Sequence, residues 1–529
     1  MTENGDGAAR RGLSRRKFLG SIGAGAAGAV TLGNGAGVLA GALPAAAAPP
    51  SLPAVPAGRF GRMFHQRPFG EPGPRLSEAL MDIGRAGGIL DASDDLGAGP
   101  VALIIDPALS VNNPNNDTQT AGTTFFGQFV DHDITFDTGS RMGKPTAPES
   151  ATNSRTPALD LDSVYGAGPA GSPQLYQPGD RAKFRVESGG QFEDLPRLGD
   201  MTAVVADPRN DENLIISGLQ CAFLLAHNGA VDRVRSQGVT DTNDAFARAR
   251  RLITWHYQWL VVHEFLPQVV GPAIVDDILA RGRRYYTPAM GGGFIPVEFQ
   301  AAAYRMGHSM VRPSYRANLA GDNGQPFFAM VFDDARSDEA DPPDLTGGHR
   351  APRRFIGWQT FFDFGDGEVR PNKMIDTKLS SPLFALPMRS IASRDHPVVL
   401  PQRTLLRHVT WMLPCGQVIA RAMGAPVVAA GDLAELAGYG LGLETSTPLF
   451  YYVLKEAELQ TGGRRLGAVG GRIVAEVLIG LLQTDPGSYL VQEPTWRPTL
   501  PRRDGTSTGP FAMTDFLAFA GVDPASRGQ

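Results

Sequence analysis

Apolar residues recur at helical spacing through most of the chain. The i, i+3, i+4 and i+7 pattern of an amphipathic helix is present at 121–136, 212–234, 246–270 and 297–312. Shorter patterns of the same kind predict later helices at 403–412, 416–423, 431–437, 446–459 and 467–483. Only two short segments, near 101–105 and 326–332, have the composition of strands. We therefore predict a mainly α fold, with a single large helical domain and little β-structure.

A different composition marks the region before this domain. Residues 48–110 are rich in Pro and Gly with broken periodicity, and we expect an N-terminal arm that wraps over a domain spanning 111–529. The whole chain has 64 Gly and 42 Pro among 529 residues. Long ordered loops should therefore connect the helices.

The first 47 residues have the pattern of an export signal. Consecutive arginines in SRRKFLG (14–20) precede a weakly apolar Gly/Ala-rich run and a small-residue site that allows cleavage after Ala47. We predict a twin-arginine signal peptide over 1–47, recognition by twin-arginine export machinery and an extracytoplasmic protein. An uncleaved anchor is the alternative. No later segment has the roughly 18 uninterrupted apolar residues of a membrane span, so none is expected after cleavage.

Charge and cysteine content exclude several classes of protein. The net charge of −5 and the pI near 6.0 leave no broad basic surface for nucleic acid, so no nucleic-acid partner is expected. Cys221 and Cys415 allow at most one bridge, and two buried free thiols are the favoured interpretation.

The segment FFGQFVDHDITF, residues 125–136, places polar chemistry in an apolar frame. On a helix, Gln128, Asp131 and His132 lie at i, i+3 and i+4 and share one face, whereas Asp133 points about a hundred degrees away. Buried carboxylates and imidazoles are costly unless they are paired, hydrogen-bonded or bound to a metal. We expect one face to serve a pocket and the other an ion.

Two further motifs offer partners for that pocket. DPRNDEN (207–213) carries Arg209 and Glu212 at i, i+3, just before a predicted helix. YRMGHSMVRPSYR (304–316) sets His308 among apolar residues, which is the setting of a lone axial ligand. An imidazole, a guanidinium and an amide can together bind and polarise a small oxygen compound.

The segments GQFVDHDITF, DPRNDEN, YRMGHSMVRP and TPALDLDSVYG resemble motifs of the animal-type haem peroxidase family. The resemblance implies a secreted enzyme with haem b that reduces hydrogen peroxide and oxidises a halide, pseudohalide or small phenolic donor. It implies that His132 is the distal base and that Arg209 stabilises the charge developing on oxygen. Gln128 would hold distal water or a halide.

The same resemblance implies how haem is held. His308 would be the proximal iron ligand, and Asp131 and Glu212 match positions whose carboxylates form ester links to haem. Asn213 stands where a methionine link supports chloride oxidation in myeloperoxidase, so easier donors are expected. The implied haem-binding set is completed by Arg305, by Arg407 near a propionate, and by Thr404, which replaces the usual asparagine partner of the proximal imidazole.

A calcium site is implied by TPALDLDSVYG. Its Thr156, Asp160 and Asp162 side chains and the carbonyl of Ala158 are oxygen donors that, together with Asp133, suit a hard cation. Such an ion would hold the helix that carries His132.

Two alternative functions remain open. Fatty-acid dioxygenases of the same fold place a radical-forming tyrosine three residues before the proximal histidine, where this chain has Arg305; Tyr304 is expected to face elsewhere. A haem-bearing, peroxinectin-like adhesion protein is the other alternative, although the chain has no RGD or KGD tripeptide.

Overall fold

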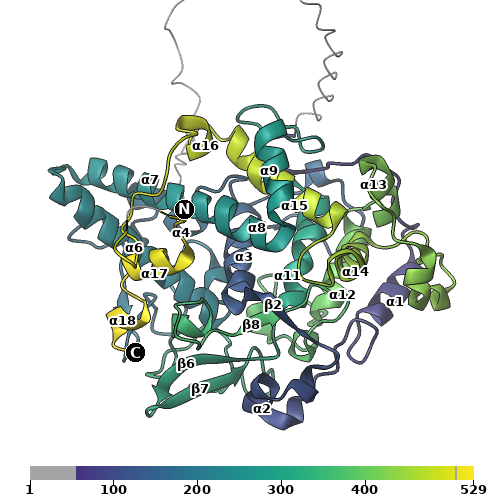
Figure 1. The fold of residues 1–529 in the computed structure, drawn as a ribbon, viewed down its shortest axis with the longest axis horizontal. Coiled ribbons are helices and arrows are strands. Elements are labelled where there is room, and N and C mark those ends of the chain that lie inside the picture. Colours follow the sequence, from purple (N-terminus) through teal and green to yellow (C-terminus); the bar gives the residue numbers. More distant parts are fainter. Residues whose placement is uncertain (1–54, 507–508) are drawn as a thin grey trace, which may run out of the picture. The chain divides into compact units, whose positions relative to one another are not determined.

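The computed structural model describes residues 55–506 and 509–529, which belong to one compact unit spanning 49–529. The predicted signal peptide lies outside the described residues. The fold of this unit is mainly helical, as predicted, with four small two-stranded sheets among the described residues (Figure 1). The α-helices are α1 Pro74–Ile83, α2 Gly99–Ile105, α3 Ala121–Ile134, α4 Asp162–Tyr165, α5 Gly168–Gly171, α6 Leu214–Ser236, α7 Thr242–Leu260, α8 Leu266–Val270, α9 Pro272–Arg281, α10 Val297–Ala301, α11 Gly307–Met310, α12 Leu400–Thr410, α13 Gly416–Met423, α14 Leu449–Thr461, α15 Ala468–Thr484, α16 Tyr489–Gln492, α17 Met513–Phe519 and α18 Pro524–Arg527.

The sheets pair strands that are mostly distant in sequence. Strand β1 runs parallel to β5, whereas β2 with β8, β3 with β4 and β6 with β7 are antiparallel. The bounds are β1 Phe60–Gly61, β2 Asn115–Thr120, β3 Glu187–Ser188, β4 Glu193–Asp194, β5 Ile295–Pro296, β6 Ser314–Asp322, β7 Gln325–Met330 and β8 Pro371–Lys373.

Helix α3 runs through the interior of this unit and packs against α6, α11 and β8 (Figure 1). Every residue of α3 except Gln128 is buried. Aromatic side chains fix its packing, since the ring of Phe129 stacks on Phe223 of α6 with centroids 4.6 Å apart. The polar residues of α3 are therefore held by a helix with little freedom to move.

Two of the predicted long helices are interrupted. The helix predicted at 246–270 begins four residues earlier, at Thr242, and contains a π-helical turn, η6 (Val261–Phe265), between α7 and α8. The helix predicted at 297–312 breaks at Ala302, whose φ of −133° and ψ of −76° are not helical. A 3-10 turn, η7 (Ala303–Met306), and the short α11 follow.

The strand predicted near 101–105 is wrong, because these residues form the end of α2. The apolar run VALII is rich in β-branched residues, but periodicity cannot distinguish a short strand from a helix, and Pro100 sits in the first turn, where it favours a helix start. The strand predicted near 326–332 is confirmed as β7. Its partner β6 was not predicted.

The region predicted as an arm contains α1 and α2 in its described part and is tied to the body. The buried carboxylate of Glu298 in α10 accepts hydrogen bonds from the backbone N–H groups of Met63 and Phe64 at 3.1 and 3.0 Å. Burial raises the pKa of Glu298. These hydrogen bonds attach the start of the described chain to the helix that leads toward His308.

Two further sequence features can be located. Cys221 and Cys415 are both buried and unpaired. Among the described residues, α6 alone has the length and apolar composition of a membrane span, but 78% of its most apolar stretch is buried inside the protein. Buried core helices meet the same criteria.

Candidate active site

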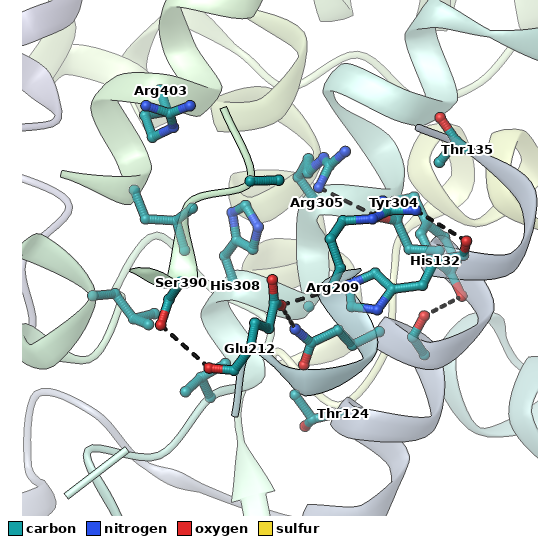
Figure 2. Close-up of a pocket in the computed structure, with 18 of the residues that line it drawn as sticks. Thr124, His132, Thr135, Arg209, Glu212, Tyr304, Arg305, His308, Ser390 and Arg403 are labelled. Carbon is teal, nitrogen blue, oxygen red and sulfur yellow. Dashed lines mark hydrogen bonds and ion pairs between the residues drawn. The ribbon is translucent and has the colours of Figure 1, made fainter. Parts of the chain in front are cut away.

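A cavity of about 480 Å³ gathers side chains from distant parts of the sequence (Figure 2). Its walls come from α3, the turn before α6, η7, α11, α12 and residues 383–393. Nine residues were predicted for catalysis and haem binding, and Thr404 alone does not line the cavity. The eight that do are Gln128, Asp131, His132, Arg209, Glu212, Arg305, His308 and Arg407.

His132 is held by a pair of buried amides. Its Nδ1 lies 2.9 Å from Oδ1 of Asn210, and the amide nitrogen of Asn210 donates to Oε1 of Gln220 at 2.8 Å. The same nitrogen donates to the backbone carbonyl of Ser163 at 3.4 Å, and because a carbonyl can only accept, Oδ1 of Asn210 faces the imidazole and Nδ1 of His132 carries a proton. In the neutral imidazole, Nε2 is then the nitrogen without a proton, and it lies on the side of Glu212.

Asn210 and Gln220 are functional residues that the sequence analysis missed. Both are fully buried. Asn210 lies between Arg209 and Glu212 in the DPRNDEN motif, and this position could have identified it as a candidate. Gln220 lies in α6 with no distinguishing sequence context, so the fold was needed to find it.

Gln128 and Glu212 form a unit beside His132. Nε2 of Gln128 donates a hydrogen bond to Oε1 of Glu212, and Oε1 of Gln128 accepts from the Asn213 side chain at 3.4 Å. The same Glu212 oxygen lies 3.5 Å from Nε2 of His132. A proton taken up by that nitrogen would therefore be stabilised by a neighbouring carboxylate.

Arg209 is fixed in the wall by Asp207. Its Nε and Nη2 donate to Asp207 at 3.0 and 2.8 Å, and Nη2 also donates to the backbone carbonyl of His132 at 3.0 Å. Burial alone would lower the pKa of Arg209, but Asp207 raises it above the usual value. The guanidinium therefore remains a permanent positive charge joined to α3 at His132.

Asp131 lies in the same cavity with an unsatisfied oxygen. Its Oδ2 is 3.5 Å from Nη1 of Arg305, whereas Oδ1 is buried without a hydrogen-bond partner among the described residues. A buried, unpartnered carboxylate oxygen costs several kcal/mol. A bound group that contacts this oxygen would therefore offset the cost of its burial.

The second imidazole belongs to His308 on α11. Its Nδ1 lies 3.2 Å from Oγ1 of Thr404, and that hydroxyl donates to the carbonyl of Leu400 at 3.1 Å. Since the hydroxyl proton is already used, Nδ1–H of His308 is the donor to Thr404. Nε2 of His308 is thus an unprotonated ligand atom. Burial lowers the pKa of His308 well below its usual value, and the positive charges of Arg305 and Arg407 lower it further.

Positive charge gathers on the side of the cavity near α12. Arg305, Arg403 and Arg407 all line it. Arg407 lies 3.7 Å from Asp137, and burial, together with Arg305, lowers its pKa to about 10. Each guanidinium has a carboxylate nearby, but those of Arg305 and Arg407 are 3.5 and 3.7 Å away, which leaves N–H donors for the carboxylates of a bound ligand. Arg403 was not among the predicted residues.

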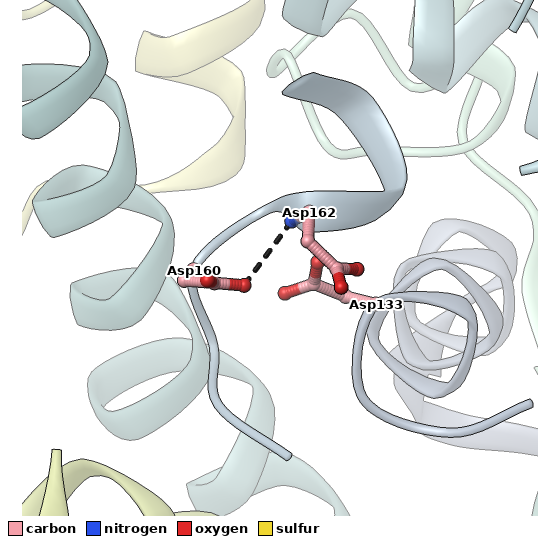
Figure 3. Close-up of side chains that lie close together, drawn as sticks. All are labelled: Asp133, Asp160 and Asp162. Atoms are coloured by element: carbon pink, nitrogen blue, oxygen red, sulfur yellow. Dashed lines mark hydrogen bonds between the residues drawn. The ribbon is translucent and has the colours of Figure 1, made fainter. Parts of the chain in front are cut away.

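A cluster of three carboxylates lies on the other side of α3 (Figure 3). Oxygens of Asp133, Asp160 and Asp162 all lie within 4.8 Å of one another. Burial and the two neighbouring charges raise the pKa of Asp133 well above its usual value, and burial and Asp162 raise that of Asp160 to about 7. The arrangement is electrostatically unfavourable by itself and has the oxygen chemistry of a hard cation site.

The other two predicted calcium ligands lie in the loop that carries this cluster. The backbone N–H of Thr156 donates to Asp162 at 2.8 Å, and that of Ala158 donates to the Thr156 carbonyl at 2.8 Å. Arg155 also contacts Asp162, at 3.2 Å. The loop is therefore folded against the cluster by its own backbone.

The expectation that Tyr304 faces away from the pocket is wrong. Its ring lines the cavity, and its hydroxyl donates to the carbonyl of Gly127 at 3.0 Å. The break at Ala302 turns η7 relative to α10, so helical spacing did not apply at this position.

Comparison with known sequences points to one family. The animal haem peroxidase family model matches residues 138–335. A peroxidase-like protein of Margaritifera margaritifera is 23% identical over 283 residues, or 42% of this chain and 35% of that protein. Chorion peroxidase of Aedes aegypti is 30% identical over 174 residues, or 30% of this chain and 22% of that protein. The chain spans about a third or less of the length of these curated relatives.

Comparison with solved structures shows the same fold. Peroxidase A of Dictyostelium discoideum has a TM-score of 0.58 at 15% identity, covering 87% of this chain and 93% of that structure. A fatty acid α-dioxygenase of Oryza sativa has a TM-score of 0.53 at 15% identity, covering 81% of this chain and 76% of that structure. The family model thus makes residues 138–335 similar to the animal haem peroxidase family, and the comparison with solved structures shows the same fold.

Proposed function

We propose that this protein is a haem peroxidase that reduces hydrogen peroxide and oxidises a small donor, either a halide, a pseudohalide or a phenol. The observation that carries the proposal is the pair of imidazoles in one cavity. His132 and His308 each have Nδ1 tied to an acceptor, Asn210 and Thr404 respectively, so each presents an unprotonated Nε2. One such nitrogen suits an axial iron ligand and the other suits a base.

The residues around the cavity fit haem. His308 would supply a nitrogen ligand to the iron, and Arg305, Arg403 and Arg407 would hold the carboxylates of the haem. The family implies this cofactor. When bound, haem supplies a redox-active iron at which the peroxide O–O bond is broken.

His132 would move one proton during peroxide cleavage. Its Nε2 would accept a proton from one oxygen of hydrogen peroxide and return it to the other oxygen, which leaves as water. Arg209, held by Asp207, stabilises the negative charge that develops on the departing oxygen. As long as Glu212 is a free carboxylate, oriented by Gln128, it stabilises the imidazolium while His132 holds the proton.

Covalent attachment of haem through Asp131 and Glu212 forms part of the proposal. The buried, unpartnered Oδ1 of Asp131 supports it, because an ester is neutral and removes the burial cost of the carboxylate. Glu212 is already engaged by Gln128 and would have to exchange that bond. Mass spectrometry of haem peptides after peroxide turnover would count the links, and haem fully extractable by acidified ketone would refute them.

A calcium ion in the Asp133, Asp160 and Asp162 cluster is also proposed, with Thr156 and the Ala158 carbonyl as further ligands. The support is the close approach of three carboxylates whose mutual repulsion a divalent cation would offset. Calcium binding by calorimetry to metal-free protein tests the site.

Export by the twin-arginine pathway is proposed from the sequence alone. The support is SRRKFLG followed by the small-residue cleavage site. Replacing Arg15 and Arg16 by lysine should retain the protein in the cytoplasm with its leader uncleaved. N-terminal sequencing of exported protein should find a start at Ala48.

The decisive experiment is an absorption spectrum of the haem-loaded protein before and after one equivalent of hydrogen peroxide. A peroxidase shifts its Soret band within milliseconds and returns to rest when iodide, bromide or a phenol is added. A haem band that ignores peroxide would reject the proposal.

A haem-dependent fatty-acid dioxygenase is the second candidate, and Tyr304 is the observation that favours it. Its ring lines the cavity. Two features count against a radical role there: Arg305 takes the position three residues before His308, and the Tyr304 hydroxyl is tied to Gly127. Oxygen uptake with palmitate, abolished by Tyr304→Phe, would favour the dioxygenase; uptake unaffected by this change would not.

A further inference from the structure

A second cavity, of about 320 Å³, lies outside the haem site. It is partly open to solvent and is lined by the end of α6, the middle of α7 and the segment that follows α16. The helix α7 and the π-turn η6 run from Trp255 in this cavity to Phe265 in the wall of the haem cavity. Ten residues at helical rise separate the two positions by about 15 Å.

The charge of this second cavity is unbalanced. Arg233, Arg248 and Arg251 line it, and Glu493 is the only carboxylate that does so. Arg248 pairs with Asp244 at 2.9 Å. Arg233 and Arg251 have no carboxylate within ion-pairing distance in the described part of the chain.

The two unpaired guanidiniums make only weak contacts. Arg233 donates to the carbonyl of Thr499 at 3.4 Å, and Arg251 lies over the ring of Trp255, 5.3 Å from its centroid. The protein as a whole carries a net charge of −5. Unpaired arginines in a concave site of an acidic protein provide fork-shaped donors for an anion, and carboxylate is the anion that they bind in bidentate fashion.

The cavity is also lined by two indole rings, one of them beneath Arg251. Trp255 and Trp496 meet nearly edge to face, with centroids 5.5 Å apart. The indole N–H of Trp255 donates to the carbonyl of Gly487 at 3.1 Å, which fixes that ring. Three of the five tryptophans of the chain lie in this group, because Trp259 packs against Trp496 at 6.1 Å.

The segment that carries Trp496 is anchored by His256. Nε2 of this buried imidazole accepts the N–H groups of Thr499 and Leu500 at 2.9 and 3.0 Å, and its ring meets Trp496 edge to face at 5.0 Å. The wall therefore exists before any ligand binds, so binding costs little ordering.

We propose that this cavity binds a small aromatic carboxylate, with the ring against Trp255 and Trp496 and the carboxylate on Arg233 and Arg251. The volume is at the lower end of the range for small-molecule sites and admits one ring system with its acid group. An inorganic anion would pair with the arginines but would make no apolar contact with the two indole rings. The site does not depend on the peroxidase function, since none of its lining residues belongs to the haem cavity.

Isothermal titration calorimetry of the full haem-loaded chain with 4-hydroxybenzoate tests the proposal. One site should bind it at least tenfold more tightly than 4-hydroxybenzamide, which has the same ring without the charge, and more tightly than acetate or phosphate. Equal affinity for the benzamide, or phosphate binding as tight as that of 4-hydroxybenzoate, would overturn the proposal.

Variants separate this cavity from the haem cavity. The double change Arg233→Gln, Arg251→Gln should weaken 4-hydroxybenzoate binding at least tenfold and leave any ligand-induced Soret shift unchanged. Arg497→Gln is the matched control, because Arg497 lies 5.3 Å from the Trp259 ring centroid but does not line the cavity. Trp496→Leu tests the indole wall. If 4-hydroxybenzoate still binds the double variant with the original affinity, the ligand binds at another site. If a variant loses 4-hydroxybenzoate binding and the ligand-induced Soret shift together, the ligand binds in the haem cavity.

Discussion

The two imidazoles of the haem cavity are held in different ways. His132 belongs to a continuous, buried 14-residue helix, and its Nδ1 is bound by Asn210, which Gln220 orients in turn. His308 belongs to a four-residue helix after a backbone break, and its Nδ1 is bound by a single threonine hydroxyl. The proposed distal base, His132, is thus fixed by Asn210 and in turn by Gln220, whereas the proposed proximal ligand, His308, has one short partner. The position of the His132 ring should therefore change little between variants, whereas the electron donation of His308 should change with its hydrogen-bond partner.

Removal of the distal base is the strongest test of this difference. His132→Ala should lower the second-order rate constant with hydrogen peroxide by about 10²- to 10⁴-fold, because the proton transfer loses its acceptor. Haem content and the resting Soret band should remain, since His308 is untouched. Stopped-flow absorbance measures the rate. A variant that reacts at the original rate would remove His132 from the mechanism.

The proximal hydrogen bond should have the next largest effect. Thr404→Val keeps the side-chain shape but leaves Nδ1–H of His308 without an acceptor, so the imidazole donates less electron density. We expect a ten- to hundredfold loss in peroxide rate and a higher reduction potential, measured by spectroelectrochemistry. Thr404→Asn, with its longer acceptor, should shift the potential in the opposite direction.

Thr410→Val is a matched control for the proximal change. Thr410 lies on the same helix, and its hydroxyl likewise donates to the carbonyl four residues earlier, at 3.1 Å, but it contacts Gly143 rather than His308. The potential should not move in this variant. Equal shifts in both variants would mean that helix packing, rather than the Thr404 hydrogen bond, sets the potential.

The tautomer of His132 should respond to Asn210. In Asn210→Leu the imidazole loses its acceptor and Gln220 loses a donor. Because the net energy of a hydrogen bond is about 1 kcal/mol, the reaction with peroxide should be about fivefold to tenfold slower. Nitrogen-15 chemical shifts of protein loaded with diamagnetic zinc porphyrin report the tautomer directly. Asn210→Asp, which keeps an acceptor, should restore the Nδ1–H form, and failure to do so would contradict the assignment.

How much of the site the sequence predicts depends on the range of the interaction. The helix at 121–136 and the spacing of its polar residues are local features, and α3 places Gln128, Asp131 and His132 on the cavity as spacing requires. Helix α13 has the predicted bounds of 416–423. Contacts between elements, such as His132 with Asn210 and Gln220, depend on packing that periodicity cannot specify.

Local rules failed where the backbone departs from regular geometry. Helical spacing directed Tyr304 away from the pocket, but the break at Ala302 turns it inward. The run at 101–105 was predicted as a strand from its β-branched residues, although it has no strand partner and Pro100 begins a helix there. Arg403 was missed because its position on the cavity comes from the packing of α12.

Removal of calcium should have the smallest effect on peroxide chemistry, because the ion would act on the position of α3 rather than on a reacting atom. Calcium at about 100 times its dissociation constant should stabilise the fold by about 2.7 kcal/mol, which is measured as a higher melting temperature. Asp133→Asn should abolish this increase. Asp366→Asn, a change at an exposed carboxylate, is the control and should retain it. The peroxide rate should change only a fewfold.

The sign of the pH dependence gives this last prediction a second test. Because the folded pKa of Asp160 is raised from about 4 to about 7, the metal-free protein holds protons that the unfolded chain releases, and its stability should fall as pH rises through that window. Calcium replaces those protons, so its stabilising effect should be larger at pH 8 than at pH 5. A calcium effect independent of pH would place the ion away from this cluster, and the distal helix would then owe its rigidity to packing and the Asn210 contact alone.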